Sequence, residues 1–195
     1  LSGQGSNGTL INGPTFNSNG WIDFDGVDDY VTSPNNVLAI PQSFTLVETS
    51  KGLLNSQNAG QNVYGAGWSS RVAFRHSTGG NNPITGLLVI RADNSTSVQV
   101  ANGTNHLDGK WHQLVATLDG DVSPEVLKIY LDGKLEVQGT IPDHSTQSPP
   151  VILGAWSGGY GFFNGSQGSA KIYNKALSES EVLQNYYQAP IVTDG

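Results

Sequence analysis

An alternating pattern in two neighbouring segments constrains the fold of this chain more than any other feature. Within them, apolar side chains recur at every second position: Leu114, Ala116 and Leu118, then Leu127, Ile129 and Leu131. Such alternation places these side chains on one face of a β-strand. Asp132-Gly133 follows directly, and this dipeptide accepts the positive φ angles of a tight hairpin turn. We therefore predict that strand 126–131 pairs antiparallel with strand 134–138.

Similar short runs of Val, Ile, Leu, Thr and aromatic residues continue along the chain, separated by clusters of Gly, Ser and Asn. This spacing is typical of an all-β protein. Strands are expected at residues 20–24, 30–32, 43–48, 71–76, 86–91, 97–101, 111–118, 126–131, 134–138, 151–154 and 169–173.

A helix is predicted only near the end of the chain. Ser178 and Glu181 stand at capping-box spacing, and Leu177 and Val182 flank them in the positions of a hydrophobic staple. Pro190 ends the segment, so a short surface helix is expected over 178–188.

The expected strands must bury their apolar faces against each other, which favours an all-β fold: a two-sheet antiparallel jelly-roll sandwich with one short C-terminal helix. The length of 195 residues is that of one ordinary domain, so we expect a single domain over 1–195.

Charge and composition exclude several classes of partner. The formal net charge of -7 disfavours binding to nucleic acid, and no apolar stretch approaches the ~20 residues of a membrane-spanning helix. Cysteine is absent, so disulfides and thiolate chemistry are excluded. Because the chain starts at Leu1 without a basic and apolar leader, we expect a processed product or a piece of a longer protein.

Several motifs occur together in a characteristic order. They are NGTL (7–10), IDFDGVDDYV (22–31), DGKWHQLVA (108–116), LKIYLDGK (127–134), FNG (163–165) and AKIYNKALSE (170–179). In this order and at these separations they resemble the laminin-G-like branch of the concanavalin A-like lectin/glucanase superfamily. The resemblance spans nearly the whole chain.

The resemblance implies a jelly roll of two curved antiparallel sheets. Members of the superfamily serve in glycan binding, adhesion and cell-surface display, and in some branches in glycoside hydrolysis. The chain departs from the family pattern in two places. No tryptophan follows Phe44-Thr45, and Gln167-Gly168-Ser169 stands where the family usually has an acidic residue before its last strand.

The pattern of acidic residues argues against a glycoside hydrolase. Retaining hydrolysis needs two carboxylates roughly 5 Å apart, which superfamily hydrolases place on alternate residues of one strand. None of the five glutamates forms such a pair in an expected strand, and Glu179 and Glu181 begin the helix. Asp23 and Asp25 alternate, but the family signature explains them structurally. We therefore expect no enzymatic activity and no catalytic residues.

Sugars are recognised by aromatic rings that stack on their C–H faces and by polar groups that bond their hydroxyls. Aromatic and guanidinium side chains in or beside Gly-rich loops are the candidates: Trp156, Tyr160, Trp68, Arg71, Arg75 and Tyr64. Trp156 is either a sugar platform or an edge aromatic that covers the core, and Arg71 and Arg75 form either a polar row or a solvated strand face. Trp21 and Trp111 are interpreted as packing residues.

Calcium is the cofactor that the chain suggests. Members of the superfamily often hold calcium at the sandwich rim, and a hard cation takes several oxygen ligands. Asp25, Asp28 and Asp29 offer such oxygens on a short loop. The alternative is that these aspartates bond their own backbone, as Asp-Gly turns do.

We therefore expect a non-catalytic carbohydrate-binding or adhesion module, a lectin displayed outside the cell on a cell or virion surface. Its partner would be a glycan or a surface protein. The alternative is a structural protein for decoration or assembly of a virus particle or surface layer, which would form homo-oligomers. Neither function involves nucleic acid or membrane insertion.

Overall fold

The computed structural model describes residues 8–34, 41–53, 61–65, 73–78, 86–92, 96–99, 106–141, 151–155 and 161–189. Over residues 61–99 it describes the backbone of the strands.

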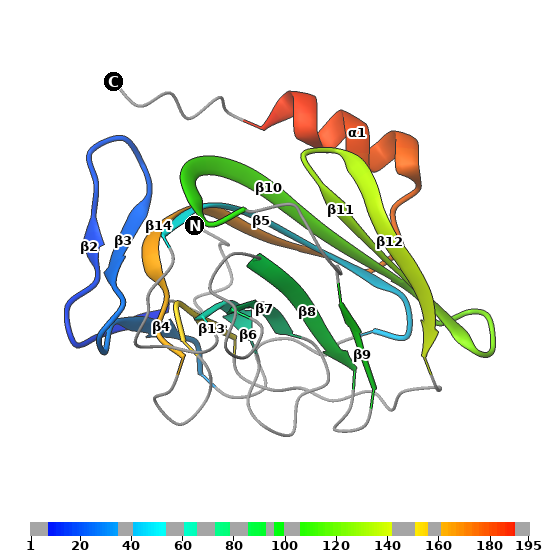
Figure 1. Cartoon of the computed structure of the whole chain (residues 1–195), viewed down its shortest axis with the longest axis horizontal. Helices are drawn as coiled ribbons and strands as arrows, with labels where there is room; N and C mark the ends of the chain where they lie inside the picture. The colour runs from blue at the N-terminus through cyan, green and yellow to red at the C-terminus, as the bar shows by residue number, and fades with distance from the viewer. Residues whose placement is uncertain are drawn as a thin grey trace.

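Two antiparallel sheets, each of seven described strands, face each other (Figure 1). One, here called the β10 sheet, has the order β12-β11-β10-β5-β14-β3-β2, and the other, the β7 sheet, has the order β1-β4-β13-β6-β7-β8-β9. The predicted two-sheet antiparallel fold is confirmed.

The strands of the β10 sheet are β2 (Thr15–Phe16), β3 (Ile22–Asp25), β5 (Phe44–Leu53), β10 (Asp108–Asp119), β11 (Glu125–Leu131), β12 (Lys134–Ile141) and β14 (Asn164–Tyr173). Those of the β7 sheet are β1 (Thr9–Ile11), β4 (Tyr30–Thr32), β6 (Gln61–Gly65), β7 (Ala73–Thr78), β8 (Gly86–Ala92), β9 (Thr96–Gln99) and β13 (Ile152–Leu153). The helix α1 spans Glu179–Gln188.

The alternating segments form the centre of the β10 sheet. Their apolar residues stand opposite each other in the register pairs Leu114 with Leu131, Ala116 with Ile129, and Leu118 with Leu127, and they join the largest buried cluster. Asp132 and Gly133 have φ angles of 51° and 78°, as a tight hairpin turn requires. The predicted hairpin between β11 and β12 is confirmed.

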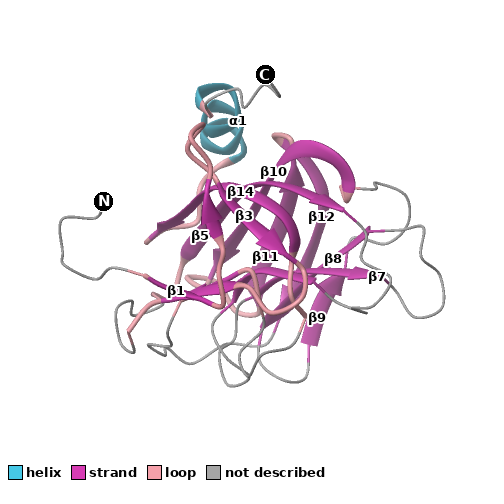
Figure 2. Ribbon diagram, turned by 90° about the vertical axis from the view of Figure 1, so that its left-hand side faces the viewer, coloured by secondary structure: helices cyan, strands magenta, loops and turns pink. Residues whose placement is uncertain are grey.

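The outer face of the same sheet is covered in part by α1 (Figure 2). Val47, Val115 and Tyr130 form a second buried cluster there with Leu177 and Val182. The centre of the β10 sheet is therefore apolar on both faces, which explains why residues 44–50 of β5 are all buried.

The helix begins as the sequence predicts. Ser178 is the N-cap, and its side chain and that of Glu181 bond each other's backbone N–H groups in a capping box. The hydroxyl of Thr45 fixes the preceding segment, because it donates to the Lys175 carbonyl and accepts from the Leu177 N–H. No helix in the described part of the chain is both long and apolar enough to cross a membrane.

Some strands extend beyond their predicted limits. The predicted strand 43–48 continues to Leu53, although Thr49, Ser50 and Lys51 are polar. These residues stay extended because β5 pairs with β10 on one side and with β14 on the other. The short edge strands β1 and β2, and β6, are not predicted from the sequence. β1 pairs with β4 and β6 pairs in part with the distant β13, whereas β2 is only two residues long.

Glu48 is a buried acid on β5. Its side chain lies on the same face of the strand as those of Leu46 and Ser50. The residue is 1% exposed, and its Oε1 accepts a hydrogen bond of 2.9 Å from the Ser50 hydroxyl. Burial raises the pKa of Glu48 to about 8, and the Ser50 hydrogen bond offsets only part of this rise. The carboxyl group therefore carries its proton at neutral pH.

The pH dependence of stability tests this protonation. The folded state holds the Glu48 proton up to about pH 8, whereas the unfolded state releases it near pH 4.5, so the free energy of unfolding falls as pH rises between these values. Glu48→Gln keeps the shape and removes the titration. We expect the variant to be more stable than the parent by about 2–3 kcal/mol at pH 7 and the difference to vanish near pH 4. Urea unfolding at both pH values measures this, and a difference independent of pH would contradict it.

Candidate functional site

The chain crosses from one sheet to the other in the loop between β3 and β4. β3 belongs to the β10 sheet and β4 to the β7 sheet, so the intervening residues lie at the rim of the sandwich. Gly26, with a φ of 76°, allows the chain to turn there. The loop carries the three aspartates that the sequence predicts as metal ligands.

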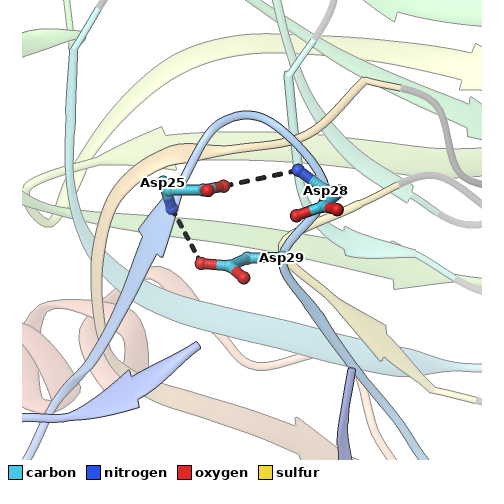
Figure 3. A group of neighbouring side chains, drawn as sticks. All are labelled: Asp25, Asp28 and Asp29. Atoms are coloured by element: carbon cyan, nitrogen blue, oxygen red, sulfur yellow. Dashed lines mark hydrogen bonds between the residues drawn. The ribbon is translucent and has the colours of Figure 1, made fainter. Parts of the chain in front are cut away.

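The structure brings Asp25, Asp28 and Asp29 together (Figure 3). One carboxylate oxygen from each lies within 4.8 Å of the others. Asp29 is buried, whereas Asp25 and Asp28 are exposed. The cluster is thus open to solvent on the side of the two exposed carboxylates.

Hydrogen bonds to the backbone hold two of these carboxylates in place. The N–H groups of Val27 and Asp28 donate to Oδ1 of Asp25 over 2.7 and 3.3 Å, and the Asp25 N–H donates to Oδ2 of Asp29 over 3.1 Å. From outside the loop, the Asn12 side-chain amide donates to the Asp28 carbonyl over 3.0 Å. The expected Asp-Gly turn bonding is therefore present, and it leaves Oδ2 of Asp25, Oδ1 of Asp29 and both Asp28 oxygens without hydrogen bonds among the described residues.

The electrostatics of the loop disfavour three ionised carboxylates without a neighbouring positive charge. The pKa of Asp29 is raised, chiefly by burial and further by the negative charges of Asp25 and Asp28, while the Asp25 N–H opposes the rise. No Lys, Arg or His of the described chain forms an ion pair with the cluster. Clustered carboxylate oxygens suit a hard divalent cation such as calcium, with backbone carbonyls and water completing its ligands.

Two of the residues predicted to bind a ligand lie in described strands of the β7 sheet. Tyr64 lies in β6, opposite Leu153 of β13, and Arg75 lies in β7, opposite Asn62. The described segment that contains β13 ends at Ala155. The remaining predicted ligand residues lie outside the described residues: Trp68, Arg71, Trp156 and Tyr160.

Trp21 and Trp111, interpreted as packing residues from the sequence, contact each other and are both half-buried. Their ring centroids are 5.2 Å apart, with a 60° angle between the ring planes. Asp23, close to Trp21 in the chain, accepts a hydrogen bond from the Ser166 hydroxyl. Sequence reasoning missed this group because its members come from three separate segments, at β3, β10 and β14.

Comparisons with known proteins give the following matches. The sequence model of the concanavalin A-like lectin/glucanases superfamily matches residues 25–183. No curated protein sequence matches the chain. A solved structure, the heptameric SAP-like pentraxin from Limulus polyphemus, is 12% identical with a TM-score of 0.65, and the alignment covers 88% of this chain and 83% of the pentraxin.

Two bacterial toxin structures are also similar. The botulinum neurotoxin type G receptor binding domain is 14% identical with a TM-score of 0.67, over 95% of this chain and 47% of the domain. The botulinum neurotoxin serotype D ligand binding domain, solved in complex with N-acetylneuraminic acid, gives the same four values: 14%, 0.67, 95% and 47%. This chain spans about half the length of these domains. At such identities the likeness shows a shared fold.

Proposed function

Because the chain belongs to the concanavalin A-like lectin/glucanases superfamily, we propose that it is a non-catalytic carbohydrate-binding or adhesion module, displayed on a cell or virion surface. The observation that carries the proposal is the rim loop, where three carboxylates with unused oxygens converge at the crossing between the sheets. The sialic acid complex of a toxin domain with the same fold supports a glycan as the ligand.

The position of the glutamates supports a role without catalysis. Glu48 and Glu125 are 1% and 0% exposed, so neither reaches a bound sugar. Glu179 and Glu181 lie in the first turn of α1, and Glu181 is engaged in the capping box and with Lys175. Hydrolysis would require a pair of accessible carboxylates on facing positions.

The proposed sugar contacts come from two segments of the sequence, residues 64–75 and 156–160. Trp156 and Tyr160 supply apolar platforms, and Trp68, Tyr64, Arg71 and Arg75 supply stacking and hydroxyl-binding groups. The pairing of β13 with β6 supports this grouping, because it places Leu153, close to Trp156 in the sequence, beside Tyr64.

A calcium ion at Asp25, Asp28 and Asp29 is part of the proposal. A bound calcium would offset two of the three negative charges and offer coordination positions to hydroxyl oxygens. The chain's own contribution is to hold the ligands ready, since Asp25 and Asp29 are already fixed by backbone N–H groups.

A structural role in assembling a virus particle or surface layer is the second candidate. It is favoured by exposed apolar residues near α1, namely Tyr187, Leu183 and Leu135, which are 75%, 41% and 36% exposed. Native mass spectrometry separates the two functions. An assembly protein is expected to form homo-oligomers without glycan, whereas a lectin that acts as a monomer is not.

Loss of glycan binding on Trp156→Ala tests the proposed sugar contacts. On a glycan array the parent is expected to bind at least one class of glycan, and the variant to lose at least tenfold in affinity because the stacking platform is removed. Tyr187→Ala, which removes a 75% exposed aromatic ring on α1, serves as the control and is expected to bind like the parent. Equal binding by Trp156→Ala and the parent would remove Trp156 from the site.

Thermal unfolding with calcium and with a chelator tests the rim site. Calcium at millimolar concentration, on the order of the dissociation constants of extracellular modules, is expected to raise the Tm by a few degrees. Asp28→Asn removes a carboxylate whose oxygens bond no other described residue, so it should keep the fold and lose most of the shift. A parent Tm that calcium does not change would contradict the site.

A further inference from the structure

The outer face of the β10 sheet is only partly covered by α1. Val47 and Val115 lie under the helix, and side chains alternate along each strand, so Lys51 and Trp111 lie on the same outer face. Lys51 and Trp111 stand directly opposite each other in the pairing of β5 with β10. This part of the face extends from β10 across β5, β14 and β3 to β2.

A polar row crosses this face at one register position. Lys51 stands opposite Ser166, Ser166 opposite Asp23, and Asp23 opposite Thr15. Neighbouring strands are about 4.8 Å apart, so the row presents a polar group at each such step. The Ser166 hydroxyl donates to Oδ1 of Asp23 over 2.5 Å, and the Asn17 amide lies 3.4 Å from Oδ2.

The Trp21–Trp111 pair lies beside this row. A Cβ atom at Gly168 would lie 3.3 Å from Cζ3 of Trp111, so the glycine lets the indole lie close against β14. The bulge in β14 between Gln167 and Ser169 falls at this glycine. Both tryptophans are half-buried, and their rings are tilted by 60° to each other.

The chemistry of this surface is that of sugar recognition. Indole rings stack on the C–H faces of a sugar, while a carboxylate, an amide and hydroxyl groups bond its hydroxyls. Lys51 and Asp23 carry opposite charges in the same row, which favours an uncharged ligand over an anion or a cation. Polar residues stand beside the pair, since Lys51 is opposite Trp111 in the sheet and Asp23 is two residues from Trp21.

We propose that Trp21 and Trp111, together with the row from Thr15 to Lys51, form a second binding surface for an uncharged oligosaccharide on the sheet face beside α1. This inference rests on the proposed glycan-binding function but uses none of the residues proposed above as sugar contacts or calcium ligands. The Asp23 carboxylate accepts hydrogen bonds from sugar hydroxyls, and the tilted indoles hold the apolar faces of the sugar rings.

Titration of the full chain with uncharged hexasaccharides tests the proposal. The probes are linear α-glucan, β-glucan, xylan and chitin oligosaccharides, and binding is measured by calorimetry. Asp23→Asn keeps the shape of the side chain, and Trp21→Ala removes one ring. Each is expected to weaken binding of the preferred probe by about tenfold, the loss typical of a hydrogen bond to a charged group or of a stacking contact. Unfolding midpoints of both variants check that each remains folded.

Phe16→Ala is the matched control, because Phe16 is 71% exposed and adjoins Thr15 in β2, so its side chain points to the opposite face of the strand. It is expected to bind like the parent. If Trp156→Ala weakens binding while Asp23→Asn and Trp21→Ala do not, the second surface is wrong and the sugar site at Trp156 stands. If the reverse holds, the second surface stands and the sugar site at Trp156 is wrong. A parent that binds none of the probes overturns the second surface.

Discussion

Burial of the central β10 sheet on both faces is the constraint on which the rest of this structure depends. Leu46 and Leu114 fill the space between the sheets, while Val47 and Val115 on the opposite face pack under Leu177 and α1. Removing both faces from water is the main favourable contribution to folding for these strands. The doubly covered strands β5, β10 and β11 therefore form the rigid part of the fold, and even the carboxyl group of Glu48 is kept protonated there.

The surface available for recognition follows from this burial. The parts of these strands that are covered on both faces have no side chains left to present to a ligand. Two other places remain open to solvent, namely the rim, where the chain crosses between the sheets, and the part of the outer face that α1 leaves uncovered. The aspartate loop at the rim and the Trp21–Trp111 pair occupy these two places. Both adjoin strands that the core holds in register, so the binding proposed at each would need little reorganisation.

Local signals in the sequence predict the local features well. The Asp132-Gly133 turn and the Ser178 capping box depend on neighbouring residues, and both are confirmed. The clustering of the rim aspartates is likewise predicted, because they share one short loop. The extension of β5 depends on flanking strands, and the contact of Trp21 with Trp111 depends on sheet order. Neither is encoded by a local pattern, so neither could be predicted.

Amide hydrogen exchange measured strand by strand tests the central claim most directly. If both faces of the β10 sheet stabilise the fold together, the amides of β5, β10 and β11 should exchange slowest and at a common rate set by global unfolding. The amides of the β3–β4 loop and of β2 should exchange faster, because they lie at the rim and at the sheet edge. Exchange of the β5 and β10 amides as fast as that of the rim loop would contradict the account.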